Sequence, residues 1–578
     1  MHRTRLTALA LACATLPAAA QGPLTRRVSV ATNGAQANGP SAGAALARGG
    51  EFVAFLSTAS NLVAGDTNRA QDLFVRDLFF DVTARESVSS SGAQADAESS
   101  STRVSISANG RFVAFCSRSA SLVPGDTNDQ DDVFLRDRST GTTIRVSVSS
   151  AGQQGDRASG DPSVSDDGRF VAFISEATNF VAHDASSAAD VFLRDRLAGT
   201  TTLVGVSELG VQASLGSFAP FISGDGRFVA FTTASPELLP AGASGSQVFV
   251  HSPALGATHL ESVSTAGDVG NGDSLAPMLS TDGRWLVFRS LASNLAEGDT
   301  LGLQDGFLRD RVTHSTYLMT YGYGATEPNG ATYIRSVSDD ARYFEIGGTA
   351  TNMLPFDDNG PAQDCWVTDL AGFDNIQTGV DVTGRAVVSV PCGLSADGTI
   401  ALFSSAADHV VPGDDNGFTD LFVRTSIPES VRYFCTAKVN SLGCSPQIRA
   451  YGKSSATENA GFQIVATSVR NQRAGMLLHA FGGRVALPFA GGTLCLVSPR
   501  RSMPISSSGG SSLPANDCTG HYSLDVNTFA YGLGHGFPLP ELVSPGTLVE
   551  CQWWSRDPGF APPDAIGLTG GLEYTVGP

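Results

Sequence analysis

Lysine is almost missing from this sequence. It occurs only at Lys438 and Lys453, and only 16% of the 578 residues are charged. The formal net charge is −19, and residues 21–430 alone carry 25 basic and 48 acidic side chains, a balance of −23. An acidic surface of this kind repels phosphate backbones and anionic lipids. The composition therefore excludes nucleic acid as a partner. It leaves two interpretations open, simple solubility or attraction of cations and basic partners.

Long apolar runs are absent after the first twenty residues. No later segment offers 18 uninterrupted apolar residues, so no transmembrane segment is predicted. The N-terminus has a short basic start, an apolar core at 6–16 and three alanines at 18–20. This pattern predicts a signal peptide over residues 1–20, and hence export to the periplasm, the cell surface or the exterior. Cys13 leaves a lipoprotein site as the alternative.

Several catalytic signatures are also missing. No Cys-x-x-Cys or His-rich spacing points to structural zinc. No Gly-x-Ser-x-Gly motif is present, which excludes a propeller-linked exopeptidase. The histidines do not recur with metal spacing, and His183 and His409, beside acidic loops, are interpreted as loop residues. Because no nucleophile or acid–base cluster stands out, the sequence predicts neither catalytic nor cofactor-binding residues.

The sequence does contain a repeat. A heptapeptide of the form Asp-Gly-Arg-Phe-Val-Ala-Phe recurs seven times at steps of 57 to 60 residues. A fixed period of this size indicates a repeat fold. The first aromatic residue of the motif, or its substitute, falls at Phe52, Phe112, Phe170, Phe228, Trp285, Tyr343 and Ile400.

Each repeat is predicted to form four short strands. In the second repeat these lie near 104–107, 111–116, 132–136 and 143–148, and an Asn-Gly turn joins the first two. The second strand is apolar on both faces, so it needs cover on both sides. A four-stranded sheet packed between two neighbouring sheets provides that cover, as in the ring of a β-propeller. No helical pattern separates the strands, which excludes a parallel βαβ fold.

Ring closure can be predicted as well. The seventh repeat lacks its own fourth strand, and a strand of that type stands alone at 26–30, before the first repeat. We therefore expect a seven-bladed β-propeller over residues 24–430, closed by its N-terminal strand. A rival closing strand is 431–434, which also follows a third strand.

The pattern Ser-x-Asp-Gly-Arg-Phe-Val-Ala-Phe followed by Asp-Val-Phe-Leu-Arg-Asp resembles the TolB-like, WD-type repeats of bacterial envelope proteins. The resemblance covers roughly residues 24–430 and implies a propeller in an exported envelope protein. TolB itself is similar to a six-bladed form, whereas seven repeats are counted here.

Residues 431–578 break the repeat. Alternating runs at 461–467, 475–480 and 547–554, with dense turn residues between them, predict a β-sandwich-like domain. Cys435–Lys438 and Gln552–Pro558 resemble a C-terminal domain of large secreted planctomycete-type proteins, which implies no activity.

Nine cysteines are present, and export permits disulfides. Cys116, at the end of a buried strand, is interpreted as a free thiol. Disulfides are expected at three places, whose connectivity the sequence does not define: Cys365 and Cys392, Cys435 and Cys444, and Cys495 and Cys518.

The loops between second and third strands repeat a second motif, Gly-Asp-x-Asn followed by Asp. Oxygen ligands at this spacing suit calcium, whereas the alternative is Asx-turn chemistry, in which Asp and Asn cap backbone amides. The fifth repeat keeps the acids Asp299 and Asp305, and the third keeps Asp184 and Asp190. The candidate calcium ligands are Asp66, Asn68, Asp72, Asp126, Asn128, Asp132, Asp414, Asn416 and Asp420.

These observations predict an exported, monomeric, non-catalytic interaction or scaffold protein. Its loop face would bind a protein or glycan partner, with no cofactor other than calcium. The competing hypothesis is a secreted carbohydrate-active hydrolase or lyase that uses the acids of the ring face as general acid and base.

Overall fold

The computed structural model describes residues 25–78, 80–99, 103–182, 184, 188–323, 326–354, 359–370, 374–381, 385–425, 431–434, 437–443, 446–452, 462–470, 472–481, 484–489, 492–497, 500–508, 520–532, 539–558 and 566–576. These residues fall into two compact units, one over 25–425 and one from 431 onward. The predicted signal peptide lies outside the described residues.

The first unit is a β-propeller whose described strands form seven four-stranded antiparallel sheets. We number the sheets 1 to 7 by their innermost strands, which are β2 (Ser41–Leu46), β6 (Ser105–Ile106), β10 (Ser159–Val164), β14 (Phe218–Ile222), β18 (Ser274–Leu279), β22 (Thr332–Val337) and β26 (Val390–Leu394). The second strands are β3 (Phe52–Ser57), β7 (Phe112–Ser117), β11 (Phe170–Ser175), β15 (Val229–Thr233), β19 (Trp285–Ser290), β23 (Tyr343–Gly348) and β27 (Ile400–Ser405). The third strands are β4 (Asp72–Asp77), β8 (Asp132–Asp137), β12 (Asp190–Asp195), β16 (Gln247–Ser252), β20 (Asp305–Asp310), β24 (Asp364–Asp369) and β28 (Asp420–Thr425). The outer strands are β5 (Val82–Arg85), β9 (Thr142–Arg145), β13 (Thr200–Leu203), β17 (Ala257–Leu260), β21 (Ser315–Leu318), β25 (Asp374–Gln377) and, for sheet 7, β1 (Thr25–Arg27).

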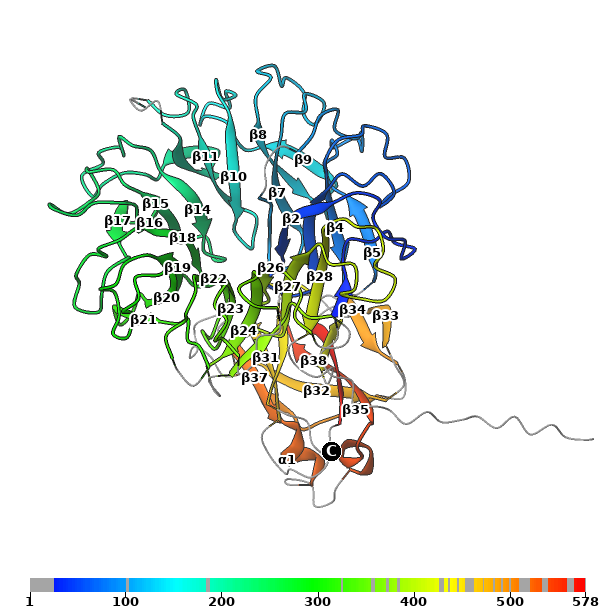
Figure 1. Cartoon of the computed structure of the whole chain (residues 1–578). Helices are drawn as coiled ribbons and strands as arrows, with labels where there is room; N and C mark the ends of the chain where they lie inside the picture. The colour runs from blue at the N-terminus through cyan, green and yellow to red at the C-terminus, as the bar shows by residue number, and fades with distance from the viewer. Residues whose placement is uncertain are drawn as a thin grey trace, which may run out of the picture. The chain divides into compact units, whose positions relative to one another are not determined.

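The sheets stand side by side around a common centre (Figure 1), and neighbouring sheets share their hydrophobic cores. One core joins Leu56 of β3 to Val113 of β7, and the next joins Cys116 of β7 to Val171 of β11. The second strands are therefore covered on both faces, as their doubly apolar pattern predicts.

The N-terminal strand completes the seventh sheet. β1 pairs antiparallel with β28, with Thr25 opposite Arg424. The Ser29 hydroxyl donates a hydrogen bond of 2.5 Å to Asp420. The predicted closure is thus confirmed. The rival strand is wrong as a closure, because β29 (Val431–Phe434) pairs with β39 (Ile566–Thr575) in the second unit.

The repeated Asp-Gly turn is held by its own aspartate. In sheet 3 the Asp167 carboxylate accepts hydrogen bonds from the Ser165 hydroxyl at 2.6 Å and the Arg169 backbone N–H at 2.9 Å. The Arg169 side chain lies over the Phe170 ring and forms an ion pair of 2.7 Å with Asp195 at the end of β12. Equivalent ion pairs join Arg111 to Asp137, Arg284 to Asp310 and Arg342 to Asp369. These repeated arginines therefore have a structural role.

The second unit contains three sheets. The largest has the order β29, β39, β38 (Leu548–Arg556), β32 (Ala474–Ala480) and β35 (Arg501–Ser502), with β36 (Ser506–Ser507) also paired to β32; a second has β30 (Gln447–Gly452), β31 (Phe462–Val469) and β37 (Gly520–Asp525); the third has β33 (Arg484–Phe489) and β34 (Gly492–Leu496). Two short helices, α1 (Val526–Ala530) and η1 (Pro540–Val543), follow β37. Trp553 is buried in the core and stacks on Tyr522, with ring centroids 5.0 Å apart. The strands predicted in this region are present, and Trp553 is a core residue.

The cysteines differ in part from expectation. Cys116 is a buried free thiol, as predicted. Cys365 and Cys392 are also free, so the disulfide expected there is a wrong prediction. The two residues lie in neighbouring sheets, but Cys365 belongs to one hydrophobic core and Cys392 packs against another. Burial raises the pKa of the Cys392 thiol to about 11. Cys495 is disulfide-bonded, whereas Cys435, Cys444 and Cys518 lie outside the described residues.

Candidate functional site: the loop face of the propeller

Two sets of loops meet at one end of the sheets. The loops between second and third strands bond to the loops that lead from one sheet to the next. For example, the Thr67 N–H donates to the Gln94 side chain at 3.3 Å, and Thr127 donates to Gln154 in the same way. We call this end the loop face. The acidic motifs predicted to lie together on one face are found there.

In three sheets an arginine bridges the two motif acids. In sheet 2 the Arg145 guanidinium lies 3.1 Å from Asp126 and 3.1 Å from Asp132. The equivalent distances are 3.3 and 3.5 Å in sheet 1, where Arg85 contacts Asp66 and Asp72. In sheet 7 they are 3.5 and 3.6 Å, where Arg27 of β1 contacts Asp414 and Asp420.

The asparagines of the motif form hydrogen bonds within their own loop. The Asn68 amide donates to Asp72 at 3.0 Å, and its oxygen accepts the Ala70 N–H at 3.1 Å. Asn128 and Asn416 repeat the bond to Asp132 and Asp420. This is the Asx-turn alternative left open above. Calcium at these nine residues stays a prediction, and the geometry weighs against it because a guanidinium already lies between the two acids of each pair.

In sheet 3 a glutamine side chain, instead of an arginine, lies between the two acids. Its outer strand has Leu203, opposite Phe192, where sheets 1, 2 and 7 have the bridging arginine. The Gln212 side-chain nitrogen instead donates to Asp184 at 2.7 Å and to Asp190 at 2.8 Å. A donor from the chain thus stands between the acids in all four of these sheets.

Sheet 5 departs from this rule. Leu318 is paired with Phe307 at the arginine position, and among the described residues no guanidinium forms an ion pair with Asp299 or Asp305. A third acid, Glu327, approaches from the loop between sheets 5 and 6. Single carboxylate oxygens of Asp299, Asp305 and Glu327 lie within 4.8 Å of one another. Sequence reasoning found the first two acids and missed Glu327, whose signal is the loss of the arginine at Leu318.

The Asp299 carboxylate is the least satisfied of the three. Asp299 is only 6% exposed, and neither of its oxygens has a hydrogen-bond partner among the described residues. Burial, followed by the charges of Asp305 and Glu327, raises the pKa of Asp299 to about 6. Asp305, in contrast, accepts hydroxyl hydrogen bonds of 2.8 Å from Thr320 and Thr332.

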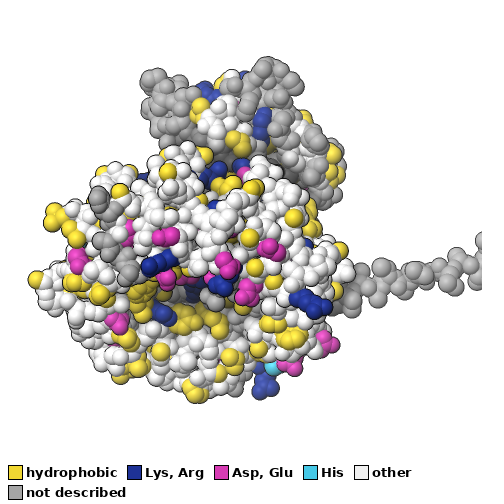
Figure 2. Space-filling view, turned by 90° about the horizontal axis from the view of Figure 1, so that it is seen from above, with side chains coloured by type: hydrophobic (Ala, Val, Ile, Leu, Met, Phe, Trp, Pro, Cys, Tyr) yellow, Lys and Arg dark blue, Asp and Glu magenta, His cyan; other side chains and the backbone are white. Residues whose placement is uncertain are grey.

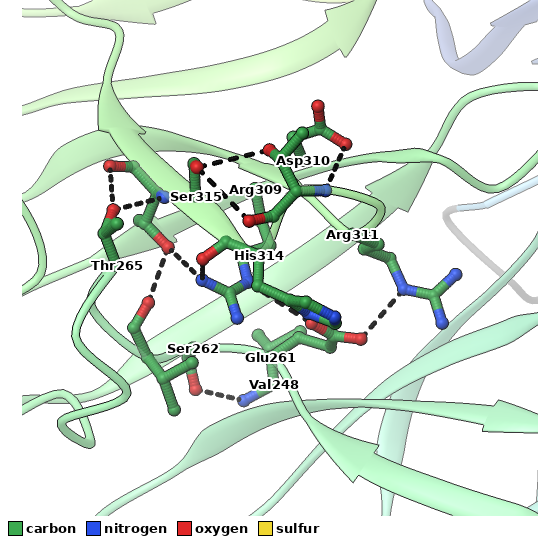
Figure 3. Close-up of polar contacts among 12 residues, drawn as sticks. Val248, Glu261, Ser262, Thr265, Arg309, Asp310, Arg311, His314 and Ser315 are labelled. Atoms are coloured by element: carbon green, nitrogen blue, oxygen red, sulfur yellow. Dashed lines mark hydrogen bonds and ion pairs between the residues drawn. The ribbon is translucent and has the colours of Figure 1, made fainter.

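Two acids that lie between neighbouring sheets also form ion pairs with arginines of the same chain. Glu261 precedes sheet 5 and lies between Arg309 of β20, at 3.4 Å, and Arg311, which directly follows that strand, at 2.9 Å (Figure 3). Glu86 forms the same pairs with Arg136 of β8 and with Arg138, which directly follows β8. These two carboxylates link neighbouring sheets through ion pairs, so they are not available as a general acid or base.

The histidines do not form a site in the described part of the chain. His183 lies outside that part, and His409 is exposed beside the loop of sheet 7. His251 is buried, 2.9 Å from the Thr258 hydroxyl, and burial lowers its pKa to about 4. Among the described histidines, only His259 forms an ion pair with an acid of a connecting loop, the exposed Glu208 at 3.5 Å.

The surface offers hollows of different kinds. Figure 2 shows one side of the molecule hollowed, with hydrophobic side chains in the hollow and acidic and basic ones near its rim. A pocket beside Trp366 and Met353 in sheet 6 holds only about 10 Å³, too small for a sugar. A cavity of about 460 Å³ in the second unit is lined by His479, Arg501, Ser502, Met503, Pro504, Ile505, Phe529 and Leu539.

Comparisons with known proteins give the following result. No family model matches the sequence, and no curated protein is detectably similar to it. Among solved structures, oligogalacturonate lyase from Vibrio parahaemolyticus is 9% identical, with a TM-score of 0.42 over 70% of this chain and 98% of that one. A putative TolB from Agrobacterium tumefaciens is 15% identical, with a TM-score of 0.30 over 48% and 79%. The propeller domain of the Trilobed protease from Pyrococcus furiosus is 9% identical, with a TM-score of 0.40 over 67% and 96%. We take no functional argument from these likenesses.

A search of the described residues for membrane-spanning helices found none of sufficient length and hydrophobicity.

Proposed function

We propose that this chain is an exported, non-catalytic interaction protein whose loop face binds a protein or glycan partner. The observation that carries the proposal is that most acid pairs on that face already bind an arginine or glutamine side chain of the protein itself. In sheets 1, 2, 3 and 7 each acid pair is held by an arginine or glutamine of the same chain. A carboxylate fixed in this way maintains loop shape and cannot readily exchange protons with a substrate.

Exposed apolar side chains on the same loops support a binding role. Leu209 is 90% exposed, Leu215 64% and Tyr323 62%, and all three lie on loops that connect sheets. Large apolar side chains at protruding loops are suited to burial against a partner. The inner strands add Phe218 and Val390, which are also exposed.

The test compares two faces of the propeller. Leu209→Ser, Leu215→Ser and Tyr323→Ser together should reduce capture of the partner from envelope extract or from a glycan array at least tenfold. The matched control is Leu197→Ser, Leu255→Ser and Val312→Ser, because these residues are equally exposed but lie on the turns at the opposite end of the sheets. Equal binding by both triple variants would overturn the assignment to the loop face.

The alternative function, a carbohydrate-active enzyme, requires two carboxylates that change protonation during turnover. A polysaccharide turnover screen on the full chain would decide, since turnover lost on a single Asp→Asn change with the fold retained would replace our proposal.

Export is part of the proposal and has its own test. Cleavage after Ala20 should give a secreted protein whose mass begins at Gln21. A lipid-modified Cys13 would instead indicate a membrane-tethered lipoprotein. The sheets of the second unit make it a β module suited to attachment or recognition.

A further inference from the structure

At one place on the loop face, in sheet 5, the balance of acidic and basic side chains differs from that in sheets 1, 2 and 7. In sheets 1, 2 and 7 two carboxylates and one guanidinium give each loop a local charge of −1. In sheet 5 the arginine position is Leu318 and a third carboxylate is added. The local charge of this loop is therefore −3 when Asp299, Asp305 and Glu327 are ionised.

Three carboxylates so close together repel one another strongly unless a cation lies between them. At such short distances the repulsion between like charges is poorly screened, because little water lies between them. The loop backbone nevertheless holds the acids in place. The Glu327 carboxylate accepts the Thr300 and Leu301 N–H groups at 2.8 and 2.7 Å, which fixes it over the loop of Asp299.

The buried Asp299 carboxylate points to a ligand. Its oxygens have no hydrogen-bond partner in the described part of the chain and are shielded from solvent. The equivalent acid of sheet 2, Asp126, contacts Arg145 at 3.1 Å. The partner that Asp299 lacks is thus a positive charge at the position that the guanidinium occupies elsewhere.

We propose that Asp299, Asp305 and Glu327 bind a calcium ion, which takes the place of the arginine used in sheets 1, 2 and 7. The donors are all oxygen, which suits a hard divalent cation, and calcium tolerates the irregular geometry of loop carboxylates completed by water. A bound divalent ion returns the local charge from −3 to −1, the value of the arginine-bridged loops. The site joins the loop of sheet 5 to the loop that enters sheet 6.

The experiment measures calcium binding by the full chain, using titration calorimetry and thermal unfolding in calcium or in chelator. Calcium at about 10 mM exceeds the weakest dissociation constants of extracellular calcium modules, about 1 mM, by tenfold. We expect a higher Tm in calcium. Asp299→Asn and Glu327→Gln should each weaken calcium binding at least tenfold, and both are close in shape to the native residue.

Two further variants make the result specific. Asp126→Asn, at the equivalent position of sheet 2, should keep the full calcium response. Leu318→Arg should abolish the calcium response and raise the Tm in chelator, because the guanidinium then replaces the ion. If Leu318→Arg does not fold, the Glu327→Gln result stands alone. The proposal is overturned if calcium leaves the Tm of the native protein unchanged, or if Asp126→Asn loses the response while Asp299→Asn keeps it.

Discussion

Gly168 packs directly against the ring of Phe112 in the preceding sheet. A Cβ atom at Gly168 would lie 2.3 Å from two ring carbons, and the residue has φ +67°. Gly110 stands in the same relation to Phe52, and Gly226 to Phe170. The glycine and the aromatic residue of the repeated motif therefore meet across the boundary between sheets, which explains why they recur together.

Gly168→Ala should destabilise the propeller by about 2–4 kcal/mol, from the left-handed backbone and the overpacked ring together. Gly199→Ala is the matched control. It has φ +70° but open space around its Cβ position, so only the backbone cost of about 1–2 kcal/mol applies. Chemical denaturation measures both. Equal losses in the two variants would refute a steric role for Phe112.

Deletion of residues 21–32 should lower the Tm and the free energy of unfolding by about 3–5 kcal/mol. The deletion removes β1 and takes Arg27 away from two acids of sheet 7, Asp414 and Asp420. Arg27→Leu alone should give part of this loss. Calorimetry that finds no change after the deletion would contradict closure by the N-terminal strand.

Glu261→Gln should cost about 3–5 kcal/mol, because two buried arginines of sheet 5 then lose their shared counter-charge. Glu208→Gln is a suitable control. Glu208 is exposed and forms a pair of 3.5 Å with exposed His259, so its loss should stay within about 0.5 kcal/mol. Urea denaturation of the two variants compares a buried pair with an exposed one.

The contribution of His251 to the free energy of unfolding should be lost as the pH drops from about 6.5 to 4. The pKa of His251 is lowered to about 4 by burial, so the unfolded chain takes up this proton at a higher pH than the native protein does. The contribution is complete above the unfolded pKa and is lost through this window. In His251→Gln the slope of stability against pH should decrease in this window. Unfolding curves at several pH values measure the slopes.

Strand positions could be predicted here because the signals are local. The Asp-Gly turns and the doubly apolar second strands mark each repeat, and β7 and β8 lie within a residue of their expected bounds. Closure was predictable by counting strands. The free thiols of Cys365 and Cys392 were not, since proximity in the sheet order says nothing about the direction in which each sulfur points.

The site was predictable only in part. The motif showed which acids gather on the loop face, but their partners come from other strands. Arg145 follows Asp132 by 13 residues and reaches it only through the register of β8 and β9. Glu327 belongs to the next connection, outside the motif altogether. Comparing the outer strands position by position would have shown Leu318 in place of arginine.

The closing strand also sets the order of events during synthesis. Thr25 and Arg424, which touch in sheet 7, are 399 residues apart. Closing so long a loop adds little to the entropy cost, which grows only with the logarithm of length, but pairing over such distances is slow. Until the chain has emerged to residue 425, the first strand has no partner and the ring stays open. The protein therefore reaches its final stability only after the whole propeller has been made.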